Sequence, residues 1–355
     1  MKCTWGDICT LEYGKALRDY TEGRTEENRF RVFGTNGPIG WSSRALAPGP
    51  GVIVGRKGAY RGINFSPEPF FVIDTAYYLR PKDDQLDLKW AYYKLLTVDI
   101  NRIDVGAAIP TTSRDAFYAV SVDVPPRAKQ EALVATLSAY DDQIENNRRR
   151  MALLEEAARL LYREWFVRLR FPGHEHTRIM DGVPEGWERT SFETALTLQR
   201  GFDLPIQLRQ AGDIPIYGST GISGYHDKFK VKGPGIITGR SGTLGEVHFV
   251  RDDFWPLNTA LWVKEFRRVT PLFALFLLRS MDLKQYNGGV SVPTLDRKTV
   301  HRVEVLIPTQ RLLTGFNELA STFFDQVANL ALQNEKLKIA RDLLLPRLMS
   351  GDLVP

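Results

Sequence analysis

The sequence predicts an α+β fold in which two mostly β domains are separated by two long helices that form an antiparallel coiled coil. Three observations predict this fold. They are a set of glycine-containing segments that occurs twice, a change in composition after each β-type stretch, and two long runs of heptad spacing. The two halves are expected to be related by a pseudo-two-fold internal repeat.

The repeat is visible in three pairs of segments that share one offset of 184 residues. The segments VFGTNGPIGW (32–41), GVIVGR (51–56) and DTA (74–76) return as IYGSTGISGY, GIITGR and NTA. Chance similarities would not keep the same offset. Because one repeat is about half of the chain, it indicates duplication of a large unit rather than a solenoid of short repeats.

Each half begins with a β-type domain, which we predict at residues 1–127 and 186–308. Short apolar runs bounded by Gly and Pro predict strands in both domains. The predicted strands lie at 52–54, 70–73 and 119–122, and in the second copy at 236–238, 254–257 and 302–305. One helix is expected inside each domain, at 88–97 and at 271–280.

After each domain Gly and Pro become rare, and helical segments follow at 128–170 and 309–355, with helices expected at 129–169 and 310–345. Apolar residues alternate at spacings of four and three from Leu133 to Trp165 and from Phe316 to Leu348, which is the heptad pattern of a coiled coil. The alternative is a pair of amphipathic helices, each packed on its own domain, but such long runs disfavour it. Pro346 is expected to end the second helix, which leaves a contact between Leu133 and Leu348 unsupported.

The two seams each contain one asparagine, and these residues select a register. Facing residues of an antiparallel pair have numbers with a constant sum, and a sum of 481 places Asn147 opposite Asn334. Other heptad registers bury each asparagine without a partner, which costs about 1–3 kcal/mol. We therefore expect Asn147 and Asn334 to fix the register. The same register pairs Trp165 with Phe316 and Tyr140 with Arg341.

Composition is that of a globular chain with two or three domains, since 43% of the 355 residues are hydrophobic and 25% are charged. The net charge of +5 permits binding to a polyanion without requiring it. The two cysteines build no disulfide framework or zinc site, and neither a signal peptide nor a membrane-spanning run is evident, so we expect a cytoplasmic protein. In the linker 171–185, His174, Glu175 and His176 are more typical of a solvated segment than of a metal site.

Catalytic motifs are missing from the sequence. It contains no phosphate-binding loop, no GxGxxG, no HExxH, no paired cysteines, and no Asn/Asp-Pro-Pro-aromatic motif of amino-methyltransferases. This pattern favours a binding protein. A nuclease or methyltransferase with a degenerate site and a purely structural coiled-coil adaptor are the alternatives.

Two pairs of loops have the composition of nucleic-acid contacts. The loop 55–62 and its copy 239–246 combine glycines, which let a backbone approach a ligand, with the equivalent Arg56 and Arg240, which can bind phosphate or guanine. Segment 106–114 and its copy 289–298 combine hydroxyls and Arg beside a proline. The simpler interpretations are a solvent-facing Arg on a β-turn and, for Thr111 and Thr294, capping of the next element.

A third pair comprises 35–37 and 219–221, where Asn36 could bind adenine. Lys57 and Arg61 become Ser241 and Gly245, so matching frames carry different polar side chains. Two domains that read different DNA sequences would need different side chains on the same frame. Sequence drift after the duplication would produce a similar difference. The predicted contacts to double-stranded DNA are Thr35, Asn36, Arg56, Lys57, Tyr60, Arg61, Thr111, Thr112, Arg114, Ser219, Thr220, Lys228, Arg240, Ser241, Thr243, Thr294, Arg297 and Lys298.

Taken together and in order, several segments resemble the DNA specificity subunit of type I restriction–modification systems across nearly the whole chain. The carrying segments are GVIVGRKG (51–58), IDTA (73–76) with LNTA (257–260), VSVPTL (290–295), IENNRRR (144–150) running to REWFV (163–167), and LLLPRLMSG (343–351). The last two helical segments are similar to the family's central and C-terminal conserved regions.

The resemblance implies that each β domain is a target recognition domain that reads one half of a split DNA site. It also implies that the helices dock two methyltransferase subunits and that restriction subunits join the complex. S-adenosylmethionine, ATP and Mg would be bound by those partners, with no cofactor, metal or active site in this chain. A specificity subunit of a solitary methylation or other phage-defence complex, without a cleaving subunit, is the alternative within this reading.

The expected helices also suggest that the chain sets a fixed distance between the two half-sites. About 35 helical residues give a spacer of roughly 50 Å, which corresponds to roughly 15 base pairs between domain centres. The DNA sequence recognised does not follow from these residues.

Overall fold

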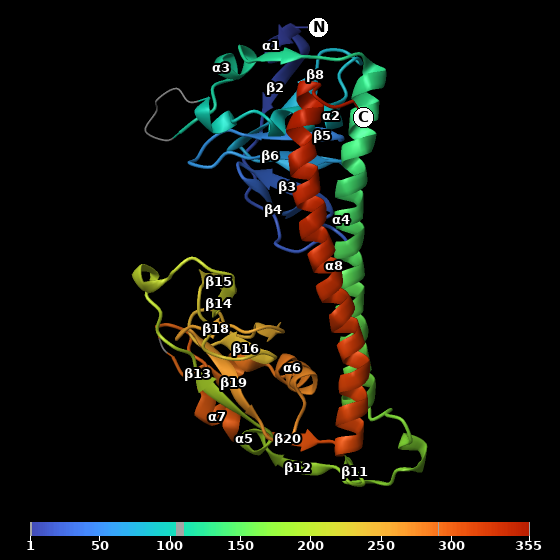
Figure 1. Cartoon of the computed structure of the whole chain (residues 1–355), viewed down its shortest axis with the longest axis vertical. Coiled ribbons are helices and arrows are strands. Elements are labelled where there is room, and N and C mark those ends of the chain that lie inside the picture. The colour runs from blue at the N-terminus through green and yellow to red at the C-terminus, as the bar shows by residue number, and fades with distance from the viewer. Residues whose placement is uncertain (1, 104–109, 290, 355) are drawn as a thin grey trace. The chain divides into compact units, whose positions relative to one another are not determined.

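The computed structural model describes residues 2–103, 110–289 and 291–354. The chain divides into two compact units, one made of residues 1–147 and 332–355 and the other of residues 148–331. Each unit contains one β domain and one part of each long helix (Figure 1).

The β domain of the first unit contains a four-stranded sheet, a three-stranded sheet and a two-stranded ribbon. Its strands are β1 (Lys2–Thr4), β2 (Cys9–Tyr13), β3 (Phe30–Gly34), β4 (Gly37–Ser42), β5 (Gly51–Gly55), β6 (Ile63–Ser66), β7 (Phe70–Val72), β8 (Ala76–Pro81) and β9 (Ser121–Asp123). The larger sheet is antiparallel with the order β2–β8–β5–β6, and the smaller has the order β4–β3–β7, with β7 parallel to β3. Strands β1 and β9 form the ribbon.

The β domain of the second unit repeats this topology. Its strands are β10 (Ile179–Met180), β11 (Val183–Pro184), β12 (Glu188–Ser191), β13 (Leu196–Arg200), β14 (Ile214–Gly218), β15 (Gly221–His226), β16 (Gly235–Gly239), β17 (Val247–Val250), β18 (Trp255–Pro256), β19 (Ala260–Phe266) and β20 (Glu304–Ile307). The sheets have the orders β13–β19–β16–β17 and β15–β14–β18, and β12 pairs with β20. The ribbon of β10 and β11 lies in the preceding linker and has no counterpart among the described residues of the first unit. The predicted duplication therefore extends to the strand order of every major sheet.

Short helices complete each domain. They are α1 (Trp5–Ile8), α2 (Leu88–Leu96), η1 (Ile100–Arg102) and α3 (Arg114–Tyr118), followed by η3 (His174–His176), α5 (Phe192–Ala195), η4 (Ile206–Leu208), α6 (Pro271–Ser280), η5 (Leu283–Tyr286) and α7 (Arg297–His301). Helices α2 and α6 occupy the predicted positions. Helices α3 and α7 were not predicted, and the strands that follow them begin two residues later than the predicted 119–122 and 302–305.

The starts of α3 and α7 correct the capping alternative for Thr111 and Thr294. Ser113 caps α3 by accepting a hydrogen bond from the backbone N–H of Ala116, and Asp296 caps α7 by accepting from Lys298. Both caps lie two residues beyond the expected threonines, because the helices begin after these threonines have already entered an extended segment.

Helix α6 illustrates how the core of the second unit is built. Thr270 and Pro271 start it, since proline suits the first helical position, and every residue from Leu272 to Leu278 is buried. Such a helix packs on more than one side. It contacts β16 and β17, and Phe276 lies against Tyr162 and Phe316 of the long helices, with ring centroids 5.6 and 6.1 Å away.

Two equivalent glycines allow the sheets of each domain to pack closely. A Cβ on Gly51 would lie 2.4 Å from the ring of Phe70, and a Cβ on Gly235 would lie 2.5 Å from the ring of Phe254. Both rings are fully buried. The repeated glycine at the start of β5 and β16 therefore makes room for a repeated phenylalanine.

The long helices are α4 (Arg127–Tyr162), which continues as the π-helical turn η2 (Arg163–Val167), and α8 (Gln310–Ser350). The expectation that α8 would end before Pro346 is wrong. Leu345, Leu348 and Met349 are buried in the same apolar cluster as Leu133, and this packing holds the helix through a proline that removes one hydrogen bond near its end.

Helices α4 and α8 lie side by side in antiparallel order (Figure 1). In the first unit Asn147 bonds to Asn334, and in the second unit the rings of Trp165 and Phe316 are 6.2 Å apart. Both pairs have numbers that add to 481. Within the described part of the chain, no helix is long and apolar enough to cross a membrane.

Candidate nucleic-acid interface

Three loops that are far apart in sequence meet at one edge of the first β domain. The N–H of Gly62 donates to the carbonyl of Thr35 (2.9 Å), which joins the loop after β5 to the β3–β4 turn. The N–H of Gly58 donates to Pro110 (3.0 Å), which joins the same loop to the segment before α3. All three candidate loops of the first copy therefore form one surface.

The second β domain brings its own three loops together in the same way. The N–H of Gly242 donates to Pro293 (2.9 Å), the counterpart of the bond from Gly58 to Pro110. A Cβ on Gly239 would lie 3.0 Å from the carbonyl oxygen of Ser219, so the β14–β15 turn is also close. The two surfaces are built on one frame.

Arg56 and Arg240 occupy the same place in this frame. The backbone N–H of each donates to the carbonyl of an equivalent threonine, Thr75 (3.0 Å) or Thr259 (2.8 Å). The guanidinium Nη1 of each donates over 3.0 Å to the carbonyl that precedes this threonine. These bonds use one of the five guanidinium N–H groups, and both side chains are half-exposed, so each arginine is oriented and retains donors that could contact DNA.

The side chains around this arginine differ between the copies. In the first unit the guanidinium groups of Arg56 and Arg114 lie 4.8 and 4.5 Å from the ring centroid of Tyr13. Gly14 and Gly201 are equivalent, because a Cβ on either one would collide with a main-chain carbonyl directly after equivalent strands, β7 and β18. The residues that precede these glycines, Tyr13 and Arg200, therefore occupy equivalent positions. The first surface presents a tyrosine between two arginines, whereas the second has at the same position an arginine paired with Asp203 at 3.7 Å.

Two predicted contact residues are buried. The Arg61 side chain is 3% exposed, and its Nη2 donates to the carbonyls of Ile100 (3.4 Å) and Asn101 (2.8 Å). Thr112 is fully buried, and its carbonyl accepts a hydrogen bond from the hydroxyl of Tyr77 (3.2 Å). Both side chains are covered in this conformation, and the hydrogen bonds of these two residues stabilise the frame.

The remaining predicted contacts have solvent access. The exposed ones are Asn36, Tyr60, Arg114, Thr220, Lys228, Thr243, Arg297 and Lys298. The half-buried ones are Thr35, Arg56, Lys57, Thr111, Ser219, Arg240, Ser241 and Thr294. Lys228 follows β15 and is not part of the three-loop frame. The predicted segment 106–109 and Val290 lie outside the described residues.

The sequence did not draw attention to a cationic and aromatic group on the β3–β4 hairpin. Arg31 and Trp41 are cross-strand partners, and the guanidinium groups of Arg31 and Arg24 lie 4.7 and 5.3 Å from the ring centroid of Trp41. Arg31 and Trp41 are on one face because residues directly opposite in an antiparallel pair share a face. The glycine-containing turn between β3 and β4, which occurs again in the second copy, was the sequence signal for this hairpin and therefore for the pairing of Arg31 with Trp41.

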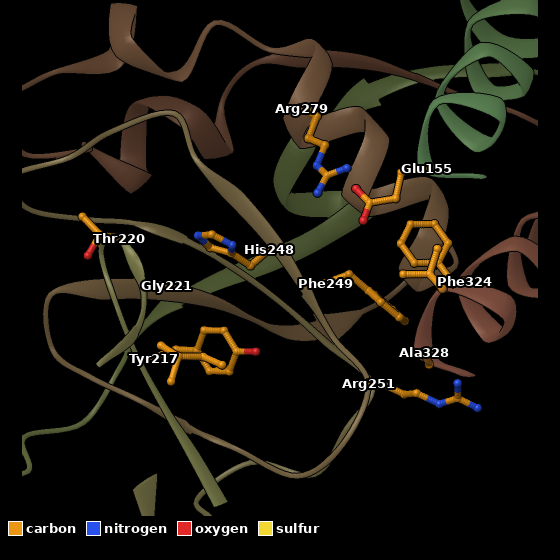
Figure 2. A pocket seen from close by; sticks show the side chains of 12 residues that line it. Glu155, Tyr217, Thr220, Gly221, His248, Phe249, Arg251, Arg279, Phe324 and Ala328 are labelled. Atoms are coloured by element: carbon orange, nitrogen blue, oxygen red, sulfur yellow. The ribbon is translucent and has the colours of Figure 1, made fainter. Parts of the chain in front are cut away.

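A cavity of about 600 Å³ opens beside the β14–β15 turn in the second unit (Figure 2). Arg279 and Glu155 point toward one another on one side, and His248 lies near Gly221 on the other. Burial lowers the pKa values of His248 and Arg279, and Arg279 donates from Nε to the carbonyl of Val247 (3.2 Å).

The linker histidines lie in the short helix η3. The Nδ1 of His174 lies 2.9 Å from the carbonyl of Phe171, and Glu175 is exposed. Within residues 2–103, 110–289 and 291–354, no group of three His, Cys, Asp or Glu side chains is arranged to hold a metal ion.

Comparisons with known proteins agree with this duplicated arrangement. A family model described as the type I restriction modification DNA specificity domain matches residues 2–156 and again 184–340. The type I restriction enzyme MjaIX specificity subunit of Methanocaldococcus jannaschii is 26% identical, over 98% of this chain and 85% of that protein. The HindI specificity subunit of Haemophilus influenzae is 28% identical, over 19% of this chain and 15% of its own length.

The fold is similar to a solved structure of the same kind. The crystal structure of the type I restriction–modification S subunit from M. genitalium covers 98% of this chain and 95% of its own, with a TM-score of 0.59 and 17% identity. The family assigns this chain a role in DNA specificity rather than an enzymatic one. Because the family model matches both halves, the chain belongs to the DNA specificity subunits of type I restriction–modification systems.

Proposed function

We propose that the two three-loop surfaces each read one half of a bipartite site in double-stranded DNA. The observation that carries the proposal is one frame with different side chains, in which Arg56 and Arg240 are held identically while Tyr13 lies against Arg56 and the position equivalent to Tyr13 in the second copy is Arg200, which pairs with Asp203. Arginines oriented by main-chain carbonyls suit phosphate or guanine contacts, and the changing neighbours suit different half-sites.

We further propose that the helix pair is the docking surface for two methyltransferase subunits. Its support is two pairs of apolar side chains, one pair in each unit, that face solvent at heptad spacing. In the second unit Leu153 and Leu160 of α4 are 69% and 43% exposed, and in the first unit Leu332 and Ile339 of α8 are 56% and 60% exposed. Repeated exposed apolar side chains on a helix are typical of a surface covered by a partner.

In this proposal the chain works inside the cytoplasm in a complex. The methyltransferase subunits bind S-adenosylmethionine and modify adenine, and restriction subunits that use ATP and Mg join to cleave unmodified DNA. This chain supplies the recognition surfaces and the scaffold. The alternative of a solitary methylation complex, without a cleaving subunit, has no specific observation in its favour.

The decisive experiment maps methylated adenines by single-molecule sequencing in cells that express this chain with its methyltransferase partner. We expect a motif of two short half-sites separated by a fixed gap. A single continuous motif would contradict the two-reader proposal, and an absence of any sequence-specific methylation would contradict the assignment of this complex to DNA modification.

The spacing role can be tested in the same assay. Inserting seven residues into both helices, between Arg148 and Arg149 and between Ala331 and Leu332, keeps the heptad pattern and lengthens the pair by about 10 Å. We expect a gap longer by about three base pairs. An unchanged gap would show that the helices do not set the spacing.

Partner docking has its own test. Leu153→Gln combined with Leu160→Gln should weaken co-purification with the methyltransferase subunit by about ten-fold, because two apolar contacts are lost. Arg150→Gln, an exposed change on the same helix, is the matched control and should leave assembly unchanged. Equal assembly of all three proteins would place the docking surface elsewhere.

A further inference from the structure

Each β domain is attached to the helices through its internal helix, and the two attachments differ chemically at equivalent positions. An offset of 183 residues relates α2 to α6 and the starts of α4 and α8. We call the set in the first unit the polar joint, which comprises Lys89, Tyr93, Gln130, Asp141 and Arg341. The set in the second unit is the apolar joint, which comprises Leu272, Phe276, Leu313, Phe324 and Ala158.

Asp141 is the centre of the polar joint. Its Oδ2 accepts a hydrogen bond from the hydroxyl of Tyr93 on α2 (2.6 Å), and its Oδ1 accepts from Nη1 of Arg341 on α8 (2.6 Å). The side chains of Asp141 and Arg341 are 21% and 24% exposed, so the pair is partly shielded from solvent. One carboxylate on α4 therefore connects three helices.

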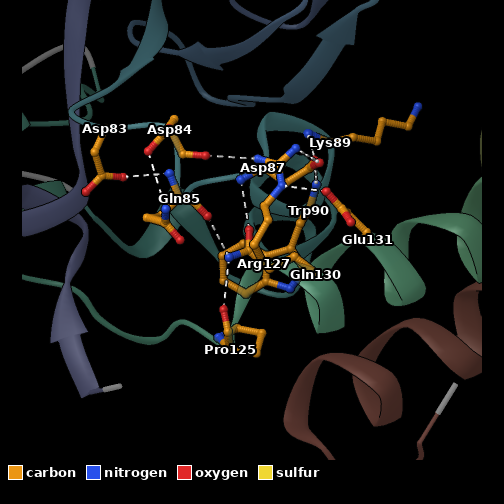
Figure 3. Close-up of polar contacts among 10 residues, drawn as sticks. All are labelled: Asp83, Asp84, Gln85, Asp87, Lys89, Trp90, Pro125, Arg127, Gln130 and Glu131. Atoms are coloured by element: carbon orange, nitrogen blue, oxygen red, sulfur yellow. Dashed lines mark hydrogen bonds and ion pairs between the residues drawn. The ribbon is translucent and has the colours of Figure 1, made fainter.

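A second polar contact ties the beginning of α4 to the beginning of α2 (Figure 3). The buried Gln130 donates from Nε2 to the carbonyls of Gln85 and Pro125, both at 2.9 Å, and its Oε1 accepts from the N–H of Asp87 at 2.8 Å. Arg127 pairs with Asp87, the residue that caps α2, at 3.0 Å. These bonds have defined directions, so they restrict rotation of α2 on the long helix.

At the equivalent positions the apolar joint has ring contacts in place of these bonds. Beside it Arg251, which follows β17, pairs with Asp325 of α8 at 2.9 Å, but these side chains are 51% and 58% exposed, so this ion pair contributes little. Phe276 lies 6.3 Å from Phe324, and Phe249 of β17 lies 5.1 Å from the same ring. Cavities of about 600 and 480 Å³ border the contact between Phe249 and Phe324, and both rings line both cavities. Figure 2 shows the larger one. Apolar attraction is not directional, and the cavities leave room for the rings to shift.

We propose that Asp141 is a positioning residue for the first recognition surface, which it orients on the helix pair by holding α2 through Tyr93 and α8 through Arg341. The apolar joint holds the second recognition surface with a wider range of orientations. This inference rests on the proposed function, in which the two surfaces read half-sites at a fixed spacing. It adds that the precision of the spacing comes mainly from the first unit.

The test compares Asp141→Leu with Phe324→Leu, the change at the equivalent position of the other joint. Binding of the purified full chain with its methyltransferase partner is measured on duplexes whose gap is shorter or longer by one base pair. We expect Asp141→Leu to reduce the preference for the native gap by about ten-fold, because two charge-assisted hydrogen bonds are lost. Phe324→Leu should change this preference less than about three-fold.

Hydrogen exchange of the same proteins reports the attachments without DNA. Faster exchange is expected in α2 for Asp141→Leu and in α6 for Phe324→Leu. If Asp141→Leu does not fold, Tyr93→Phe is the second variant. It removes only the hydroxyl and gives the polar joint the residue type that Phe276 has in the apolar joint. It should weaken the gap preference in the same direction, and Asp141→Asn, which keeps an acceptor for Tyr93, should retain more of it than Asp141→Leu.

Three results would overturn the proposal. One is an unchanged preference for the native gap in both Asp141→Leu and Tyr93→Phe, although hydrogen exchange in α2 is faster. That result would leave the proposed two-reader function intact. Another is an equal loss of gap preference in Phe324→Leu. A third is a wild-type complex without preference for any split site, which removes the proposed function and this inference together.

Discussion

The side-chain amide of Asn147 donates a hydrogen bond from Nδ2 to Oδ1 of Asn334 over 3.0 Å, and both residues are buried between α4 and α8. The remaining amide groups are also engaged. Asn334 donates to the carbonyl of Ile144 (3.3 Å), and Gln143 donates to Oδ1 of Asn147 (3.0 Å). A shift of one heptad would bring each asparagine against a different residue and break the pair.

Asn147→Leu should lower the free energy of unfolding by about 1–3 kcal/mol, because it leaves Asn334 buried without its donor. Replacing both asparagines by leucine should restore stability but relax the register. Urea unfolding measures the first effect. For the second, Leu154→Cys with Val327→Cys traps the native register as a disulfide, and Leu154→Cys with Ala320→Cys traps a register shifted by one heptad.

The shifted disulfide should form only in the protein that carries both leucines. Native-register trapping alone in that background would show that the asparagines do not determine the register.

Arg56→Ala should weaken binding to DNA through the first half-site, and Arg240→Ala should do so through the second, each by about 1–3 kcal/mol. Competition binding at one fixed salt concentration, with duplexes altered in either half-site, measures the effect. Arg178→Ala, an exposed change in the linker outside both three-loop surfaces, is the matched control and should leave half-site preference unchanged. Equal loss on both half-sites in either arginine variant would argue against separate readers.

Gly51→Ala and Gly235→Ala should each destabilise the protein by about 1–3 kcal/mol, because the new methyl group would overlap the buried ring of Phe70 or Phe254. Thermal unfolding is the measurement. Gly23→Ala introduces the same methyl group where no atom lies within 4 Å, so its melting temperature should stay near that of the wild type. If Gly51→Ala melts like Gly23→Ala, the sheets can separate without cost.

His301 should make the stability of the second unit depend on pH. Its Nε2 accepts a hydrogen bond from the N–H of Leu198 (3.0 Å), which requires neutral imidazole, and burial lowers its pKa below the usual 6.5. The unfolded chain therefore takes up the proton first as pH falls, and the contribution present above pH 6.5 is lost below it. We expect His301→Gln to flatten the decline in unfolding free energy over this range. A decline as steep as in the wild type would assign it to other groups.

The sequence predicted those features that depend on local periodicity or on the repeat itself. Heptad spacing located α4 and α8, and the offset of 184 residues matched strands that form equivalent sheets. The same offset identified loops that the structure brings together around Arg56 and Arg240.

Features that depend on contacts between distant segments were not predictable. Arg61 resembles an exposed loop arginine until η1 supplies the carbonyls that bind it. Pro346 should end a helix by local rules, but the burial of Leu348 and Met349 overrides them. Helices α3 and α7 have five residues each, too few to show a helical period.

The composition of the first unit also affects the order in which the protein can fold during synthesis. Its apolar cluster contains Trp90 and Leu133 together with Leu345, Leu348 and Met349, which a ribosome makes more than two hundred residues after Leu133. The second unit, residues 148–331, is continuous in sequence and can close as soon as its last residue emerges. The half synthesised first is therefore the half completed last, and during that interval its unfinished apolar face is exposed to chaperones and proteases.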